Sequence, residues 1–182
     1  RTLQQRFSHA TDLCAEAVRR TRVTAARRGW TDGFTVAVRI REYALATVQG
    51  RSPTECEALR ESATSAVANL AHAPKAVRSI LEQRLAAVAA GTVNPDVAAN
   101  EAALRLLCIR AELISGAPTP PEDLELRREY QMRRLVESMG QGERVTPAAL
   151  DDLALEWIAI GPVEPAVHDA LLARFERCRT AR

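Results

Sequence analysis

The sequence predicts an all-α protein of about eight amphipathic helices, packed as an antiparallel bundle or as an array of helical hairpins. Three observations predict this fold. Apolar residues recur every three or four positions, prolines stand where helices can begin, and glycines stand where helices can end. No run of alternating β-branched residues is bounded by hairpin turns, so we expect no sheet. The length of 182 residues and the hydrophobic content of 47% suit one domain with a full core.

The first 51 residues predict two helices. The first has an apolar face and is expected to end at Gly29. That face consists of Leu3, Phe7, Ala10, Cys14 and Ala17. The second includes Phe34 to Ile40, the most strand-like stretch of the chain, because this stretch continues through Tyr43 and Leu45 at helical spacing.

Ser52-Pro53 begins the next expected helix. Ser52 and Glu55 have the spacing of a capping box, in which each side chain bonds the backbone of the other residue. The apolar stripe of this helix is made by Cys56, Leu59, Ala63, Ala66, Val67 and Leu70. The helix after it has a stripe made by Val77, Ile80, Leu81, Leu85 and Val88.

The stretch from Val97 to Ile114 follows a cap at Asn94-Pro95 and carries apolar residues on more than one face. We therefore expect it to be the central helix. Thr119 and Glu122 again have capping-box spacing. After a cap at Thr146-Pro147, the last two stripes are made by Leu150, Leu153, Ala154, Trp157 and Ile158, and by Val167, Leu171, Phe175 and Cys178.

The expected helix ends follow one another at intervals of 18 to 25 residues, which invites a repeat hypothesis. A tetratricopeptide array would show its signature every 34 residues or so, and no such signature aligns. Short antiparallel helices with short loops give the same regularity, and we favour this interpretation. We expect residues 1–182 to form a single helical domain. Because the chain starts at Arg1 instead of Met, we also expect it to be a fragment of a longer protein.

The segment after Leu106 carries a resemblance. It reads LCIRAELISG at 107–116 and PTPPED at 118–123, followed by Arg127, Tyr130-Gln131-Met132 and Leu135. This pattern resembles the C-terminal region of bacterial proteins in the domain-of-unknown-function family number 349, most closely over residues 104–139. The opening Gln5-Arg6-Phe7 and a tail with Glu156-Trp157, Gly161-Pro162 and Arg174-Phe175 are similar in character. The resemblance implies a helical part of a long bacterial cytoplasmic chain with no established activity, and it supplies no catalytic residue.

Charge is distributed unevenly along the chain. Residues 1–51 contain ten arginines and four acidic residues, whereas the rest of the chain is net acidic. Five arginines crowd the end of the first expected helix: Arg19, Arg20, Arg22, Arg27 and Arg28. Guanidinium groups in a row can bind phosphates or an acidic partner. The alternative, which we weight slightly above nucleic acid, is a solvated face that contacts the acidic remainder of the chain.

A second charged group lies on the expected central helix and the helix after it. Glu101 and Arg105 are four residues apart and can pair. A possible polar cleft is formed by Arg110, Glu112, Arg127 and Arg128. A buried Glu112 would need a partner, and Arg127 or Arg128 would suit it. Such a group is either a structural ion pair that sets helix register or a cleft that binds a ligand or peptide carboxylate.

The sequence offers little support for catalysis. The four cysteines are far apart within apolar patterns and are expected to be buried, reduced thiols. His9, His72 and His168 are isolated, and His168 beside Asp169 is expected at the surface or an interface. No phosphate-binding, dinucleotide-binding, nucleophile-elbow or zinc-protease motif is present. We therefore expect no enzyme activity, no cofactor and no metal site.

No apolar run approaches the length of about 20 residues that crosses a bilayer, so we expect a cytoplasmic protein without membrane contact. The function that we expect is that of a non-catalytic helical module in which an exposed apolar groove takes up a partner helix. In this hypothesis the arginine-rich first helix selects an acidic surface. RNA or DNA binding by the same arginines is the alternative. The identity of the partner and the oligomeric state stay open at this point.

Overall fold

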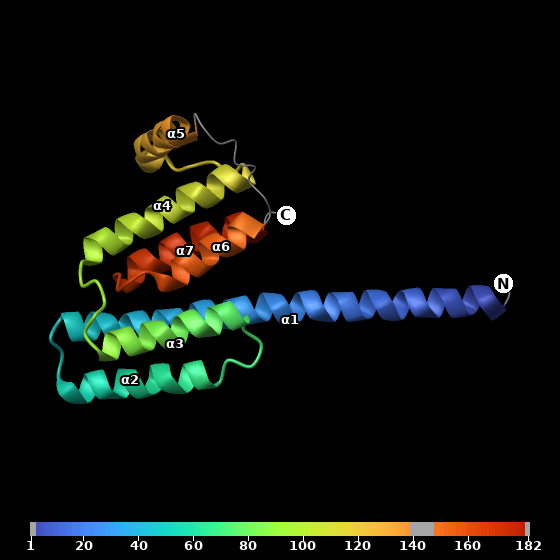
Figure 1. Cartoon of the computed structure of the whole chain (residues 1–182), viewed down its shortest axis with the longest axis horizontal. Helices are drawn as coiled ribbons and strands as arrows, with labels where there is room; N and C mark the ends of the chain where they lie inside the picture. Colours follow the sequence, from blue (N-terminus) through green and yellow to red (C-terminus); the bar gives the residue numbers. More distant parts are fainter. Residues whose placement is uncertain (1–2, 139–147, 181–182) are drawn as a thin grey trace.

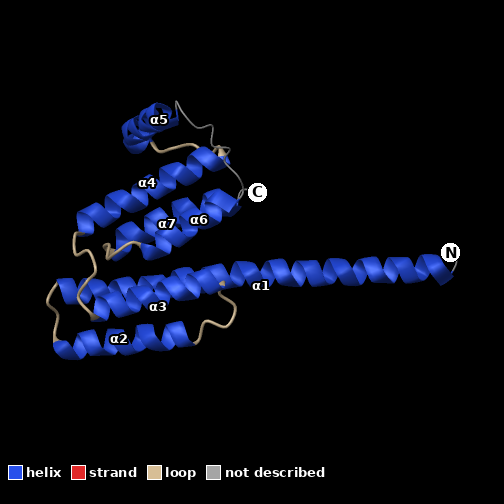
Figure 2. Ribbon diagram, in the orientation of Figure 1, coloured by secondary structure: helices blue, strands red, loops and turns tan. Residues whose placement is uncertain are grey.

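The computed structural model describes the backbone of residues 3–138 and 148–180, and the side chains of residues 14–21, 23–136 and 150–180. Across these ranges every regular element is a helix, and no strand is present (Figure 2). The all-α prediction is confirmed, with seven α-helices and one short 3-10 turn in the described part of the chain. The cap predicted at Thr146 lies outside the described residues.

Helix α1 runs from Leu3 to Val48, and its first half projects from the body of the molecule (Figure 1). The prediction that a helix ends at Gly29 is wrong. A methyl group at Gly29 would lie 2.1 Å from the backbone oxygen of His72, and one at Gly33 would lie 2.6 Å from Val77 Cγ1. Gly29 therefore permits close approach of the loop at His72, and Gly33 permits close packing of the helix that carries Val77. Helix α1 ends instead at Gly50, which adopts a φ of 65°.

Helices α2 (Pro53–Ala68) and α3 (Lys75–Ala89) pack against the second half of α1 (Figure 1). The capping box predicted at the start of α2 is confirmed. The Ser52 backbone N–H donates to Glu55 Oε2 at 3.1 Å, and the Glu55 backbone N–H donates to Ser52 Oγ at 3.3 Å. The predicted stripes cover the inner faces of both helices, where Ala63, Val67, Val77 and Leu81 are buried.

Helix α4 (Val97–Ser115) has its N-cap at Asp96, two residues after the expected Asn94, and Asp96 Oδ1 accepts from the Ala99 N–H at 2.9 Å. The expected extent of this helix is confirmed, but its expected central place is not. The layer between α4 and the α1–α3 group is made by α6 (Ala148–Ala159) and α7 (Pro165–Thr180) (Figure 1). The several apolar faces of α4 are explained by its contacts with α6 and α7, and also with α5.

The core is centred on aromatic side chains of three helices. Trp157 of α6 and Phe175 of α7 are fully buried and stack with ring centroids 4.8 Å apart. Phe34 of α1 meets Phe175 edge-on at 6.3 Å. Such aromatic pairs stabilise a core beyond the area that they bury. They fix the second half of α1 against α6 and α7.

The 3-10 turn η1 (Pro121–Asp123) and α5 (Leu124–Ser138) lie on the outer side of α4 (Figure 1). The capping box expected from Thr119 and Glu122 does not form, because the N-cap of the turn is Pro120 and the Thr119 hydroxyl donates to Glu112 instead. Met132 and Val136 of α5 are exposed. Helix α5 is thus the least covered helix of the body.

Candidate functional site

The predicted arginine cluster lies at and before the point where α1 leaves the body. Arg19 and Arg20 both form ion pairs with Glu16 of their own helix, at 2.5 and 2.8 Å, and their side chains stay 75% and 78% exposed. Arg27 and Arg28 are also exposed, and the side chain of Arg22 lies outside the described residues. For Arg19 and Arg20, the expected contact with the acidic remainder of the chain is replaced by a contact with a neighbour one turn away.

A groove runs between the second half of α1 and the antiparallel helix α7; we call it the α1–α7 groove. It consists of three adjoining hollows, two with volumes of about 370 and 310 Å³ and a small third one of about 10 Å³ towards Leu45. Its α1 side extends from Ala26 to Leu45, and its α7 side from Pro165 to Thr180. Neighbouring hollows share lining residues: Thr31 and Glu176 line the first and the second, and Val38 and Glu42 line the second and the third.

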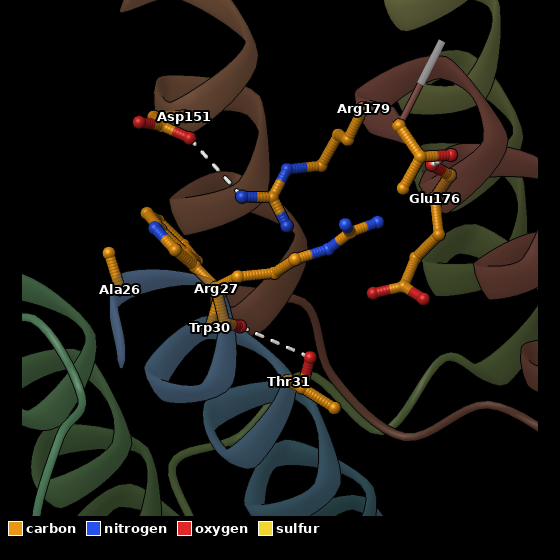
Figure 3. Close-up of a pocket in the computed structure, with 8 residues that line it drawn as sticks. Ala26, Arg27, Trp30, Thr31, Asp151, Glu176 and Arg179 are labelled. Carbon is orange, nitrogen blue, oxygen red and sulfur yellow. Dashed lines mark hydrogen bonds and ion pairs between the residues drawn. The ribbon is translucent and has the colours of Figure 1, made fainter. Parts of the chain in front are cut away.

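Charged groups lie around an aromatic floor at the end of the groove nearest the projecting half of α1 (Figure 3). The Arg179 guanidinium lies over the Trp30 ring at 4.7 Å from its centroid and donates to Asp151 at 3.2 Å. This cation–π contact and ion pair hold Arg179 in place. Arg27 extends across the same hollow, which Glu176 also lines. The hollow therefore presents two guanidinium groups and two carboxylates around apolar surface.

The predicted polar group around Glu112 is organised by a residue that the sequence analysis missed. Glu112 is 2% exposed, and Arg174 of α7 donates to its two carboxylate oxygens at 2.5 and 3.0 Å. Arg174 also bonds the buried Asp123. The prediction that Arg127 or Arg128 pairs with Glu112 is wrong. Arg174 occupies the polar gap of an apolar stripe between Leu171 and Phe175, and this position was the available signal.

The remaining members of the predicted polar cleft lie apart. Arg127 reaches Glu112 only through the Thr119 hydroxyl, which donates to Glu112 at 2.6 Å and accepts from Arg127 at 2.7 Å. Arg128 lies at the surface, 3.8 Å from Glu125. Arg110 pairs with Glu156 of α6. This arrangement favours a structural ion pair over a ligand-binding cleft, because Arg174 and Thr119 already donate to the carboxylate of Glu112.

The second predicted pair is confirmed and extends the same network. Arg105 and Glu101 are 2.8 Å apart, and Arg105 also lies 3.5 Å from Asp123. Burial alone would lower the pKa of Arg174, but its hydrogen bonds to Glu112 and Asp123 outweigh burial and raise the pKa above its ordinary value. Arg174 is therefore charged at any physiological pH and fixes α7 to α4 and η1.

His168 is buried within the chain, which corrects the expectation of a position at the surface or an interface. Its Nε2 lies 2.9 Å from an Arg41 nitrogen, which donates, so Nδ1 carries the proton and faces Asp169 at 3.2 Å. Arg41 also donates to the carbonyl oxygens of Trp157 and Ile160 at the end of α6. A cation at this place meets the negative end of the α6 dipole. The pair thus closes the C-terminal end of α6.

The environment of this pair shifts both pKa values downwards. Burial, and then the nearby charge of Arg84, lowers the pKa of Arg41 to about 9. Burial, and then the charge of Arg41, lowers the pKa of His168. A neutral His168 that accepts from Arg41 is consistent with both effects.

The cysteines follow the prediction only in part. Cys108 and Cys178 are buried, Cys56 is half-buried, and Cys14 is exposed. Burial raises the pKa of the Cys108 thiol to about 12, which disfavours the reactive thiolate. Within the described ranges no group of three or more His, Cys, Asp or Glu side chains is placed to hold a metal ion. Nothing in the described geometry assembles a nucleophile with a base.

Among the described helices, none is long and apolar enough to cross a lipid bilayer. Comparison with known proteins gives no match: no family model, no curated protein and no solved structure is similar to this chain. The resemblance to the domain-of-unknown-function family number 349 therefore stays a prediction. The function is therefore inferred from the surface of the chain, above all from the α1–α7 groove beside the projecting half of α1.

Proposed function

We propose that this chain is a non-catalytic helical interaction module of a bacterial cytoplasmic protein, and that it acts by docking a helix along the α1–α7 groove. The observation that carries this proposal is the row of three hollows that follows α1 from Ala26 to Leu45, in which each hollow shares lining residues with the next. At about 1.5 Å per residue, this side of the groove is nearly 30 Å long, which matches a partner helix of five turns.

The lining of the groove suits an amphipathic helix. Trp30, Val38 and Leu172 supply half-buried apolar surface along it. Arg39 and Glu42 supply charge at its rim. Helix-in-groove recognition uses this combination, because apolar anchors give affinity and a polar rim selects the partner.

The exposed arginines at the adjacent part of α1 favour an acidic partner surface. Arg19 and Arg20 pair with one carboxylate of their own helix and stay exposed, and surface pairs of this kind contribute little to stability. Their guanidinium groups are therefore available to a negatively charged partner. Such groups increase the rate of association and the selectivity more than the final affinity.

Site-specific photo-crosslinking in cells tests this proposal. A photoreactive amino acid at Thr35, which lines the groove, is expected to capture a protein; a second copy of this chain counts as one. The matched control places the same amino acid at Thr64, an exposed threonine on α2. A protein captured from Thr35 and not from Thr64 supports docking in the groove. Equal capture at both positions, or capture at neither, contradicts it.

Nucleic-acid binding is the second candidate, and the exposure of Arg19 and Arg20 is the observation that favours it. Binding of RNA and of duplex DNA, measured at two salt concentrations, separates the two functions. A steep salt dependence that is lost in the Arg19→Ala/Arg20→Ala variant would establish phosphate contacts and displace the first proposal. We expect no salt-dependent binding. The groove favours this outcome, since nucleic-acid binding needs no helix-sized apolar hollow.

A further inference from the structure

We propose that the helix which docks in the α1–α7 groove is the projecting half of α1 from a second copy of the chain, so that two copies exchange these half-helices in an antiparallel pair. This inference rests on the proposed function, because it names the occupant of the same groove. The pair is reciprocal: each copy contributes one projecting half and one groove.

A continuous uncovered seam runs along α1. Its members alternate at steps of three and four residues, the spacing that two helices follow when they wind around each other. In the described part of α1 this seam consists of Cys14, Ala17, Thr21, Thr24, Arg28, Thr31, Thr35, Val38 and Glu42. All of these side chains are exposed except Val38, which is half-buried. The seam crosses without interruption from the projecting half into the groove.

The two halves of α1 match in length. The projecting part covers residues 3–25, and the groove is lined by α1 from Ala26 to Leu45. Both parts are therefore roughly 30 Å long at the helical rise of about 1.5 Å per residue. A two-fold axis near residue 26 places each projecting half along the groove of the other copy.

The chemistry of the seam also suits contact with another helix. From Cys14 to Thr24 its members are small and uncharged, so a helix can approach closely on this side. The charged Glu16, Arg19 and Arg20 lie off the seam and stay in water when the seam is covered. From Cys14 to Thr24, the seam of the projecting half therefore brings no charge into the groove, where a buried charge would need a partner.

An antiparallel pair fits this surface better than a parallel one. A groove is concave and needs a convex helix, whereas a parallel pair would set groove against groove. A parallel pair would also place Arg19 and Arg20 level with the same residues of the other copy, and like charges at one level repel. In the antiparallel pair, a residue of one copy faces the residue of the other copy whose number, added to its own, gives about 52. Cys14 then lies opposite Val38, and Ala17 opposite Thr35.

Disulfide trapping tests this register directly. The variant Val38→Cys, made with Cys56→Ser to remove a half-buried thiol, pairs the new thiol with the native Cys14. Within one chain these two positions are 24 residues apart on one helix, or roughly 36 Å, so they cannot form a disulfide. Mild oxidation is expected to give a covalent dimer whose cross-linked peptide joins residues 14 and 38. A matched control that carries Thr64→Cys in place of Val38→Cys is expected to give no covalent dimer that joins residues 14 and 64.

A pair of alanine variants measures the association itself. Ala17→Glu places a carboxylate on the seam, and Ala15→Glu places the same group on the same helix off the seam; both alanines are exposed. Sedimentation velocity of the whole chain is expected to show a dimer whose dissociation constant rises about tenfold or more for Ala17→Glu and stays within roughly twofold for Ala15→Glu. Circular dichroism of both variants checks that helix content is unchanged.

The outcomes also separate this inference from the proposed function. A monomer at all concentrations, with no 14–38 product, overturns the self-pairing and leaves the groove for a different helix, which the cross-link from Thr35 would then identify. A product that joins Cys14 to Cys14, or residue 38 to residue 38, indicates a parallel pair and overturns the antiparallel register. If Ala15→Glu and Ala17→Glu weaken dimer formation equally, the interface does not follow the seam and the inference is overturned.

Discussion

Arg174 holds both carboxylate oxygens of Glu112 across the interface between α7 and α4, at 2.5 and 3.0 Å, in a part of the molecule from which water is almost excluded. The same guanidinium bonds Asp123, so one side chain connects α7, α4 and η1. A planar guanidinium suits this role because it offers several donors in fixed directions. The pair sets how α7 lies on the body and, with it, the position of one wall of the α1–α7 groove.

Removing this arginine is expected to be strongly destabilising. Arg174→Leu leaves the buried carboxylate of Glu112 without its cation and leaves Asp123 with only Arg105, at 3.5 Å. Loss of one partner of a buried pair costs about 3–5 kcal/mol. Urea denaturation followed by circular dichroism measures the change in the free energy of unfolding. The control is Arg128→Leu, because Arg128 lies at the surface beside Glu125. If the two variants lost equal stability, the buried network would not hold α7 in place.

The stability of the protein is expected to fall as the pH drops below about 6.5, because of His168. The lowered pKa of His168 in the folded state means that the unfolded chain takes up the proton first. The contribution of His168 to the free energy of unfolding is therefore fully present above the ordinary histidine pKa. It is lost as the pH falls from there towards the lowered pKa of His168 in the folded state. Protonation also removes the acceptor that Arg41 uses.

Comparison with His168→Gln isolates this effect. Glutamine keeps an acceptor for Arg41 and does not titrate. Between pH 7.5 and 5.5, the free energy of unfolding should fall more for the unmodified chain than for the variant. An identical pH dependence for the two proteins would show that His168 does not titrate differently in the folded and unfolded states.

Adding a single methyl group at Gly29 is expected to destabilise the fold although it improves helix propensity. Gly29→Ala would set its Cβ 2.1 Å from the His72 backbone oxygen, whereas Gly33→Ala would set it 2.6 Å from a Val77 side chain, which can move more easily. Overpacking costs typically 1–3 kcal/mol, and alanine gains about 1 kcal/mol over glycine within a helix. Thermal unfolding should rank Gly29→Ala below Gly33→Ala in stability; the reverse order would refute the close approach at His72.

The arginines of the projecting half are expected to contribute little to the stability of the fold. Arg19→Ala and Arg20→Ala remove only exposed pairs with Glu16, so the free energy of unfolding should change by less than about 0.5 kcal/mol per substitution. Thermal unfolding of the double variant checks this value. A large loss of stability would mean that these arginines contact the body, as the sequence had suggested.

The helices of the body could be predicted because their signals are local. Ser52 and Glu55 form their capping box within a single turn, and the stripe at Val77 and Leu81 reads at helical spacing whatever packs against it. Gly29 shows where this logic fails. A glycine within an apolar pattern either ends a helix or allows a close contact. At Gly29 only the segment that packs against it, the backbone at His72, decides between the two.

The charged contacts were harder to predict because their partners are distant in sequence. Glu112 was recognised as a residue that would need a partner if buried, but Arg174 is 62 residues away and lay within an apolar stripe. His168 and Arg41 are 127 residues apart, and nothing local distinguishes a buried histidine from an exposed one. The α1–α7 groove arises from two helices at opposite ends of the chain, so no local pattern could reveal it.

Amide hydrogen exchange along α1 tests most directly whether its projecting half is a docking element. An uncovered helix opens readily, because each residue gains little beyond its own hydrogen bond. We predict that amides of residues 14–25 become protected as the protein concentration rises, together with those lining the groove, and that Ala17→Glu abolishes this protection. Rapid exchange of residues 14–25 at every concentration, and also in the presence of whatever protein is captured from Thr35, would contradict the account.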